Sequence, residues 1–487
     1  MKPLQNASRI GHLSVLSEQA KQDLYDAALE ILGAVGMRLN HDGARMMLLD
    51  AGATQSPAGH ILIPRELVDR ARETAPTVID VFDRDGEPAM ELGGYNSYFG
   101  TGSDLMSTYD LETGEHRPST LEDVRRAARL CDALPNIDFV MSSAHPTDQD
   151  PHLSYLLSFV AMLQSTTKPL VMTAENERDL AVMIEIARAL RGGLHELRAR
   201  PYFLMYNEPT SPLTHPRDSV EKLLLCADAG VPTNYSPAPL AGATAPITVA
   251  GHTAQGIAEC LFGLVVHQLR EPGAPFLFGM GSAVLDIATA QSSYNDLGYQ
   301  MGYMCAVEMA KWLGLPNWGN AGTSDSQLPD AQMGMEANQL TLLAMLSGSN
   351  LAHDVGYLDF GLTCSLEAIV MLDEFIAANR RLVAGVPVDE ETLALETIAQ
   401  VGPGGQFLGA KHTRRHMREV QWRPTLLNRD SRENWAAAGG QDLAEKARRK
   451  ALALLAAHEV PALRPEVAAR ADELVAAFAE QTGAVLR

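Results

Sequence analysis

The chain has 487 residues, of which 46% are hydrophobic and 20% are charged, the composition of a large globular protein. Its 39 basic and 60 acidic residues give a formal net charge of -21. This balance argues against nucleic acid and anionic membrane surfaces as partners, because both need an excess of Lys and Arg, and it mildly favours a cationic substrate or a basic partner.

The first 96 residues are predicted to form a helical extension with small strands. Residues 16–36 carry apolar side chains at helical spacing, with Ser17 as the N-cap and Gly36 as the stop. A shorter helix is expected over 42–49, and residues 78–82 alternate like a strand.

From residue 97 to 384, short apolar strands alternate with long helical stretches such as 121–134 and 217–229. This alternation indicates a parallel sheet, because each parallel step needs a crossover connection. The strand candidates are 98–101, 138–142, 170–173, 202–206, 233–236, 276–280, 317–321 and 350–354. Eight such units predict an α/β fold of the (β/α)8 TIM-barrel type.

An open doubly wound sheet is the alternative fold, since it shows the same alternation. The turn FGTGSD after the first strand lacks the GxGxxG spacing typical of that fold. After the barrel, residues 385–487 are predicted to be a helical extension packed on it.

No apolar run is expected to approach the roughly 18 residues of a membrane helix, and the longest candidate, 260–269, contains His267. The N-terminal MKPLQNASRIGHLS lacks the apolar core of a secretory signal. The five cysteines form no CxxC pair, so buried free thiols are expected. These features predict a cytoplasmic protein that contacts no membrane.

The ends of the predicted strands carry polar, glycine and aromatic residues, which is typical of a pocket at the C-terminal face of a barrel. Tyr206, Tyr235, His353 and Tyr357 favour this interpretation, because aromatic residues after strands need something to pack against.

A metal site is an alternative interpretation of the strand ends, but no HExxH or HxH pattern supports it. No GxSxG nucleophile motif is present, and GPGGQFLG is interpreted as a turn between helices rather than an anion site. The side chains that would have to converge on a metal are His145, Glu175, Glu208, Asp325, His353 and Asp354.

Longer motifs resemble the trimethylamine methyltransferase superfamily over nearly the whole chain. They include ALEILGAVGMRLNHDGARMMLLDAGA, HILIPRELVDRARETAP, VFDRDGE and YFGTGSD. Further along come GNAGTSDSQLPDAQ, LLAMLSGSNLAHDVGYLDFGLTCSLE and GPGGQFLGAKHTRRHMREVQWRPTLLNRDSRENW.

The resemblance implies a barrel that moves a methyl group from an amine to the cobalt of a corrinoid (cobalamin) on a separate small protein. Founding members carry pyrrolysine near the position of 324–327 here, where this chain has ordinary residues. The chain therefore resembles the branch that demethylates quaternary amines, and glycine betaine is the first expected substrate.

The expected chemistry agrees with the residues present. A quaternary ammonium leaves as a neutral amine, so direct in-line transfer to cobalt(I) needs no general acid, general base or protein-bound metal. Its cation is bound by aromatic faces. The expected cage comprises Tyr98, Tyr206, Tyr235, Trp318 and Tyr357, whereas Phe99 and Phe278 are assigned to the barrel core.

The segment HDVGY belongs to the part of the chain that resembles the family. His353 is therefore expected to contact the substrate, at its carboxylate, with Asp354 or Asp104 near the cation. The residues expected to keep the pocket open to the corrinoid are Gly102, Gly279, Gly281, Gly322 and Asp325.

Two other function classes remain open from the sequence. One is a metal-assisted barrel hydrolase or lyase, and the other is a binding protein that senses betaines without turning them over. A homo-oligomer, a dimer or larger, is expected from the prevalence of symmetric assemblies.

Overall fold

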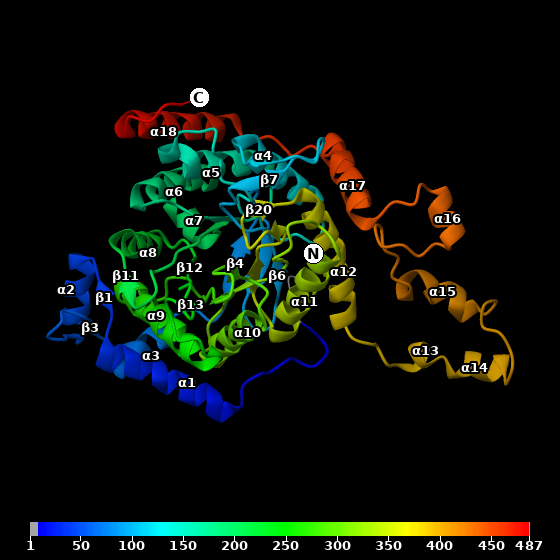
Figure 1. The fold of residues 1–487 in the computed structure, drawn as a ribbon, viewed down its shortest axis with the longest axis horizontal. Coiled ribbons are helices and arrows are strands. Elements are labelled where there is room, and N and C mark those ends of the chain that lie inside the picture. Colours follow the sequence, from blue (N-terminus) through cyan, green and yellow to red (C-terminus); the bar gives the residue numbers. More distant parts are fainter. Residues whose placement is uncertain (1–7, 487) are drawn as a thin grey trace.

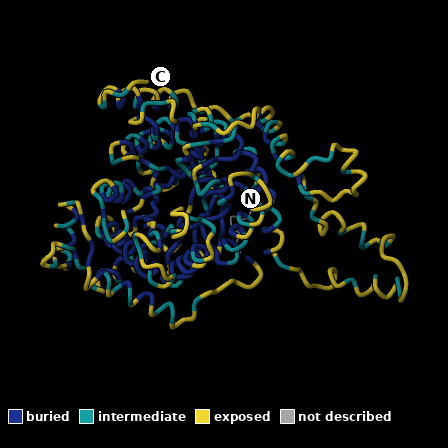
Figure 2. Tube along the Cα trace, viewed as in Figure 1, coloured by how far each residue is buried: buried dark blue, intermediate teal, exposed yellow. Residues whose placement is uncertain are grey.

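The computed structural model describes residues 8–486 and shows a mixed α/β body with an arm that projects from it (Figure 1). The first half of the sequence MKPLQNASRIGHLS, on which the secretory-signal prediction rests, lies outside the described residues. The short parallel strands lie in the middle of the body, and the helices surround them. Figure 2 shows that the buried residues gather in this body and that the arm is largely exposed.

The N-terminal segment forms the predicted elements. Helix α1 (Glu18–Glu30) begins at Ser17, whose side chain accepts a hydrogen bond from the Ala20 amide, and continues as the π-turn η1 (Ile31–Val35). Gly36 ends it with a φ of 76°, a conformation that favours glycine. Helices α2 (Asp42–Asp50) and α3 (Arg65–Thr74) and the hairpins β2 (Thr54–Gln55)–β3 (Ile61–Leu62) and β4 (Ile79–Phe82)–β5 (Pro88–Leu92) follow.

Seven of the eight predicted strand segments are regular strands, and they pair in parallel in two sheets. The orders are β14-β12-β10-β9 and β17-β18-β6. The strands are β6 (Tyr98–Phe99), β9 (Leu170–Met172), β10 (Phe203–Met205), β12 (Thr233–Tyr235), β14 (Phe276–Phe278), β17 (Trp318–Asn320) and β18 (Leu351–His353).

The segment predicted over 138–142 is not a regular strand. It makes two isolated parallel bridges instead, Phe139 with Gly100 after β6 and Val140 with Leu170 in β9. A third parallel bridge joins Phe278 at the end of β14 to Asn317, which precedes β17.

The helices between these strands match the predicted crossovers. Helix α4 (Leu121–Ala133) begins at a capping box of Thr120 and Asp123, and α8 (Arg217–Ala229) has the predicted bounds. The others are η2 (Pro151–Leu153), α5 (Ser154–Ser165), α6 (Glu177–Arg191), α7 (Leu194–Ala199), α9 (Val249–Arg270), α10 (Leu297–Trp312), α11 (Ala331–Ser347) and α12 (Leu366–Val383).

Short strands in the loops complete the body. They are β1 (Arg38–Leu39), β7 (Ser107–Tyr109), β8 (His116–Pro118), β11 (Thr214–His215), β13 (Leu240–Ala241), β15 (Ala283–Leu285), β16 (Ser292–Ser293), β19 (Tyr357–Leu358) and β20 (Thr363–Cys364). They include a three-stranded sheet, β13-β15-β16, and a four-stranded sheet, β19-β20-β7-β8. Both sheets lie in segments that follow the C-terminal ends of the central strands.

A central apolar cluster gathers inward-facing residues from nearly every central strand. The β4–β5 hairpin adds four more residues and so covers one end of this cluster. Its buried members are Ile79, Val81, Met90, Leu92, Tyr98, Phe139, Met141, Val171, Leu204, Leu277, Trp318 and Leu351. Because side chains alternate along a strand, these positions define the face of each strand that points to the centre.

Helix α9 corrects one prediction. By length and composition it could span a membrane, and it is the one helix in the described part of the chain that passes this test. The prediction that no apolar run approaches that length was therefore wrong. However, 83% of its apolar window is buried in the protein, as in a helix at the core of a globular fold.

The chain after α12 divides into an arm and two packed helices. The arm is residues 385–442 and includes α13 (Glu390–Leu393), α14 (Leu395–Val401), α15 (Lys411–Val420) and α16 (Arg432–Ala437), none of which has a buried residue. Helix α17 (Leu443–Ala457) packs on α12 and α4, and α18 (Pro465–Thr482) packs on α6 and α5. All five cysteines are free and buried, as predicted.

Candidate active site

A cavity of about 290 Å³ lies where the central strands end. It is lined by residues that follow β6, β10, β12 and β14, by residues of the 138–142 segment and of β17, by the end of β18 and the residues after it, and by α10 and the segment before it. The lining residues are Ser103, Met141, Tyr206, Glu208, Ala238, Met280, Gly281, Ser282, Ala283, Tyr294, Tyr299, Tyr303, Trp318, Gly319, Asn320, His353, Asp354, Tyr357 and Gly361.

Three rings, from β17, from β18 and from the end of β10, form one aromatic surface of this cavity. The centroid of the Trp318 ring lies 4.3 Å from that of His353 and 5.4 Å from that of Tyr206. The alternation of β17 and β18 produces this arrangement, because Trp318 and Asn320 point to the same face and Asn320 is in register with His353.

A second aromatic group comes from the segment before α10 and from its first turns. Tyr294 and Tyr299 meet edge to face, with ring centroids 5.7 Å apart, and Tyr303 donates a hydrogen bond to the Ser349 hydroxyl at 2.7 Å. Burial raises the pKa of Tyr294 to about 12 and raises those of Tyr299 and Tyr303 as well. These rings are therefore neutral at physiological pH.

His353 and Asp354 form a polar pair beside the rings. His353 Nδ1 lies 2.5 Å from the Gly319 carbonyl oxygen, so this nitrogen carries the proton and donates it to the carbonyl. His353 Nε2, which carries no proton in this tautomer, lies 3.2 Å from Asp354 Oδ2, and this oxygen accepts a hydrogen bond from the Asn320 amide at 2.6 Å. Burial lowers the pKa of His353 to about 4 and raises that of Asp354 well above its ordinary value.

Glu208 is the most accessible acid of the cavity. Protein atoms surround its carboxyl group, but the residue is exposed because it faces the space of the cavity. Its Oε2 accepts a hydrogen bond from the Tyr206 hydroxyl at 2.9 Å. Burial raises the pKa of Glu208, while the Tyr206 hydroxyl and the charge of Lys222 lower it.

Trp318 contributes a polar atom as well as a ring. The residue is 3% exposed, and its Nε1–H has no hydrogen-bond acceptor among the described residues. A buried donor without a partner costs free energy, roughly 1–3 kcal/mol. A bound molecule with an acceptor atom would remove this cost.

The structure brings six of the predicted site residues to the cavity and leaves two of the predicted cage residues outside it. The six are Tyr206, Gly281, Trp318, His353, Asp354 and Tyr357. Tyr98 lies in the central apolar cluster, and its hydroxyl accepts a hydrogen bond from the Glu91 amide. Tyr235 points outward from β12, where it packs against Gly263 of α9 and its hydroxyl bonds His215 at 2.8 Å.

The two remaining predicted acids support the walls of the cavity. Asp104 has a φ of 66° and accepts a hydrogen bond from the Ser103 hydroxyl at 2.9 Å. Asp325 accepts from the Ser293 hydroxyl at 2.5 Å and from the Tyr294 amide at 3.0 Å, so it fixes the segment that carries the Tyr294 ring.

The predicted glycines allow close packing near the cavity. A Cβ atom on Gly102 would lie 2.1 Å from Asp354 Oδ1 and 2.3 Å from the Tyr357 ring, so only glycine fits there. A Cβ on Gly279 would lie 2.6 Å from Ser236, and Gly322 has a φ of 73°. Of the four glycines, Gly281 lines the cavity itself.

Sequence reasoning missed the tyrosines of α10 and the segment before it. Tyr299 and Tyr303 lie in helix α10 and Tyr294 lies in the segment before it, whereas the predicted site residues all lie on predicted strands or just after them. The signal was available, because Tyr299 and Tyr303 are spaced i, i+4 and therefore share one face of the helix.

The six candidate metal ligands do not form a cluster. Within the part of the chain that the structure describes, the one group of three ligand atoms within 4.8 Å of one another is Glu391, His412 and His416 on the arm. The Glu391 carboxylate there is already paired with Arg415, at 2.6 Å, and with His416, at 2.9 Å.

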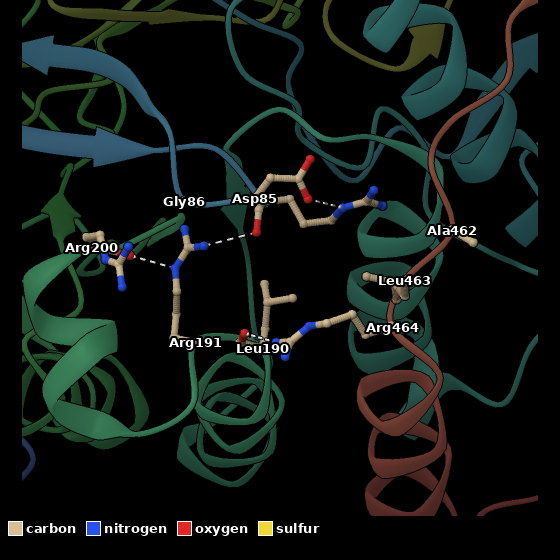
Figure 3. Close-up of a pocket in the computed structure, with 9 residues that line it drawn as sticks. Asp85, Gly86, Leu190, Arg191, Arg200, Ala462, Leu463 and Arg464 are labelled. Atoms are coloured by element: carbon tan, nitrogen blue, oxygen red, sulfur yellow. Dashed lines mark hydrogen bonds and ion pairs between the residues drawn. The ribbon is translucent and has the colours of Figure 1, made fainter.

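A second hollow of about 310 Å³ carries four arginines and is drawn in Figure 3. Arg191 donates to the carbonyl oxygens of residues 83, 84 and 200, and Arg464 donates to that of Leu190 at 2.5 Å. Arg84 donates to the Leu163 carbonyl at 3.0 Å and the Pro461 carbonyl at 2.6 Å. This hollow, which we call the arginine cleft, is lined by Arg84, Asp85, Gly86, Leu190, Arg191, Arg200, Ala462, Leu463 and Arg464.

Comparison with known proteins places the chain in a family. The family model described as trimethylamine methyltransferase (MTTB) matches residues 3–483. The trimethylamine methyltransferase MttB of Desulfitobacterium hafniense (strain DSM 10664 / DCB-2) is 30% identical over 472 residues, covering 97% of this chain and 95% of that protein. The chain therefore belongs to the trimethylamine methyltransferase (MTTB) family of methyltransferases, as its sequence motifs indicated.

Other relatives cover the chain to a similar extent. The glycine betaine methyltransferase of Desulfitobacterium hafniense (strain Y51) is 27% identical over 473 residues, covering 96% of this chain and 98% of that protein. Among solved structures, the hydroxylamine complex of MtmB matches with a TM-score of 0.49 at 12% identity, covering 94% of this chain and 90% of that one.

Proposed function

We propose that the protein transfers a methyl group from a quaternary ammonium to the cobalt(I) of a corrinoid carried by a separate protein. The observation that carries this proposal is the cavity walled by Tyr206, Tyr294, Tyr299, Tyr303, Trp318 and Tyr357. A quaternary ammonium offers no hydrogen-bond donor and is bound through aromatic faces, each worth about 0.5–2 kcal/mol. Glycine betaine, expected first from the resemblance, remains a prediction.

The pairing of the strands supports a closed (β/α)8 barrel as the frame of this site. The two parallel sheets and the three isolated bridges connect all eight predicted segments in sequence order and return from β18 to β6. We therefore propose that residues 97–384 form the barrel and that 1–96 and 385–487 are its extensions. The cavity then lies at the C-terminal face, where barrels place their chemistry.

The transfer needs positioning rather than acid–base chemistry. The electron pair of cobalt(I) forms the bond to the methyl carbon, and the pair of the broken C–N bond stays on the nitrogen of the leaving amine. No proton moves, and the product amine is neutral. The buried rings hold the cation and exclude water, and such orientation of bound reactants can supply roughly 7–11 kcal/mol.

The corrinoid protein needs a surface around the mouth of the cavity, and the loops after the strands provide one. We call this surface the apolar rim; it consists of Met106, Ile247, Ile287, Leu297, Leu328 and Leu362, which are 51–74% exposed. These loops are joined to one another, since the Ser107 amide donates to the Leu362 carbonyl at 3.2 Å and the Tyr109 hydroxyl donates to the Gln327 carbonyl at 2.7 Å.

We propose that the corrinoid protein docks on the apolar rim, because the methyl acceptor must reach the cavity at this point and exposed apolar patches mark interaction sites. Leu328→Glu should raise the KM for the corrinoid protein about tenfold or more, and should leave methylation of free cob(I)alamin unchanged. Leu393→Glu, at a similarly exposed apolar position on the arm, is the matched control. Equal effects of both substitutions would contradict this assignment.

Anaerobic methylation of free cob(I)alamin tests the activity itself. The purified protein is mixed with cob(I)alamin and, separately, with glycine betaine, proline betaine, carnitine, choline and trimethylamine. The spectral change from cobalt(I) to methyl-cobalt(III) with a quaternary amine, but not with trimethylamine, is the expected result. Tight binding of an amine without methyl transfer, even with the corrinoid protein present, would favour a binding protein instead.

The other sequence-based expectations remain predictions. A metal-assisted hydrolase or lyase activity has no observation in its favour among the described residues, because the candidate ligands of the strand ends do not form a cluster. The homo-oligomeric state and the cytoplasmic location also stay predictions.

A further inference from the structure

The charges that line the cavity bear on the fourth substituent of the ammonium. We infer that the substrate is a net cation whose fourth substituent carries no acid group and ends in a neutral acceptor such as a hydroxyl or carbonyl oxygen. This inference rests on the proposed function and narrows the substrate class from quaternary amines in general to those without a carboxylate.

The cavity offers one exposed acid, Glu208, but no positive partner. Its described lining contains the carboxyl groups of Glu208 and Asp354, and no Lys or Arg. The nearby Lys222 is not part of the lining, and its ammonium donates a hydrogen bond to the Ala174 carbonyl at 2.8 Å. A carboxylate buried here would have no cation to pair with and would face like charge, which costs several kcal/mol in a closed site.

His353 does not supply the missing cation. Its Nδ1–H is already donated to the Gly319 carbonyl, and its Nε2 faces Asp354. Burial lowers its pKa to about 4, so the ring is neutral at physiological pH. These contacts speak against the sequence-based expectation that His353 meets a substrate carboxylate.

Glu208 is placed to meet the cation itself. Its carboxyl group is exposed to the cavity, and its position is fixed by the Tyr206 hydroxyl, which donates to Oε2. A trimethylammonium in the aromatic cage would therefore have one acid at its side in addition to the rings. Opposite charges in a site of low dielectric attract strongly.

Trp318 provides the specificity for a neutral acceptor. Trp318 lines the cavity, and its buried Nε1–H has no acceptor among the described residues. One neutral donor satisfies a hydroxyl or carbonyl oxygen, whereas a carboxylate in a buried site needs several donors or a cation.

Calorimetric binding to the unmodified full chain tests the inference. Choline, glycine betaine and glycine betaine amide share the trimethylammonium and a two-carbon skeleton, and the amide has the shape of the betaine without its negative charge. Choline and the amide are expected to bind about tenfold tighter than glycine betaine, or more. Tetramethylammonium serves as the probe for the cage alone.

The outcomes separate this inference from the proposed function. If glycine betaine binds as tightly as its amide or more tightly, the inference is overturned while the quaternary-ammonium function stands. If no compound binds, including tetramethylammonium, both are overturned.

Two matched variants locate the effect in the cavity. Glu208→Gln should weaken choline about tenfold and should weaken glycine betaine less, whereas Glu175→Gln, the same change after strand β9, should alter neither. Equal losses of affinity for choline and glycine betaine in Glu208→Gln would show that the carboxyl group does not distinguish the net charge of the ligand. This result would overturn the assignment of Glu208 to the cation.

Discussion

Two hollows of this molecule have nearly the same volume and opposite chemistry. The arginine cleft, of about 310 Å³, concentrates four guanidinium groups, and the strand-end cavity, of about 290 Å³, concentrates aromatic rings and carboxyl groups. In the cleft, Arg84 and Arg191 donate hydrogen bonds to backbone carbonyls, whereas in the cavity the Trp318 N–H has no acceptor among the described residues.

This difference teaches that charge density alone does not mark a binding site. The arginines of the cleft satisfy carbonyl oxygens near the ends of helices α5 and α6, such as those of Leu163 and Leu190, and thereby join α18 to the body. Groups that the fold has already satisfied stabilise the structure, and groups left without a partner at a cavity are available to a ligand.

The largest expected effect concerns stability and belongs to the cleft. Arg84→Met should lower the free energy of unfolding by roughly 2–4 kcal/mol, because two carbonyl oxygens lose a charged donor. Choline affinity should not change. Urea denaturation and calorimetry measure the two quantities, and Arg200→Met, whose side chain pairs with Glu196 at the surface, is the control with a small loss. Weaker choline binding in Arg84→Met would break the distinction between the two hollows.

A smaller effect concerns pH and belongs to the cavity. Burial raises the pKa of Glu208, and the groups that act on it are Tyr206, Lys222 and Asp104. A cation favours the ionised form, so binding releases protons and tightens as the pH rises through this pKa. Choline should bind about five- to tenfold more weakly at pH 5 than at pH 7.5.

Calorimetry in buffers of different ionisation heat would detect the protons that choline releases. In Glu208→Gln the pH profile should be flat. A profile unchanged by this substitution would assign the titration to another group, with Asp354 as the next candidate because burial raises its pKa too.

The smallest expected effect compares two tyrosines that the sequence suggested equally. Tyr206→Phe keeps the ring in the cavity but removes the hydrogen bond to Glu208, and should weaken choline about two- to fivefold. Tyr235→Phe removes the bond to His215 outside the cavity and should leave choline affinity unchanged. Equal effects of the two substitutions would remove the reason to place only Tyr206 at the substrate.

The elements of the body were predictable because local signals agreed with the tertiary structure. Ser17 and Gly36 bound the first helix in sequence and in structure, and α8 has the predicted limits. The segment 138–142 was the exception, since an apolar run cannot show that only Phe139 and Val140 will find partners. Helix α9 was underestimated for a related reason, because full burial removes the polar face by which a helix is usually recognised.

The site was predictable only as far as strand ends define it. Tyr98 and Tyr235 were misplaced by sequence position alone: alternation turns Tyr235 outward, and Tyr98 lies toward the β4–β5 hairpin rather than the cavity. The tyrosines of α10 were missed because a helix can add one face to a site only when tertiary packing brings it there. No sequence pattern shows that Trp318 Nε1 will lack an acceptor.

The arm has a topological consequence. Its two ends are held together, because α12 before it and α17 after it pack side by side, and Figure 1 shows it leaving and returning on the same flank of the body. Residues 385–442 thus form an insertion between two helices that pack on each other, and they do not connect separate parts of the body. We expect a protease that cuts near Gly404 to leave one particle, in which the C-terminal fragment stays attached through α17 and α18.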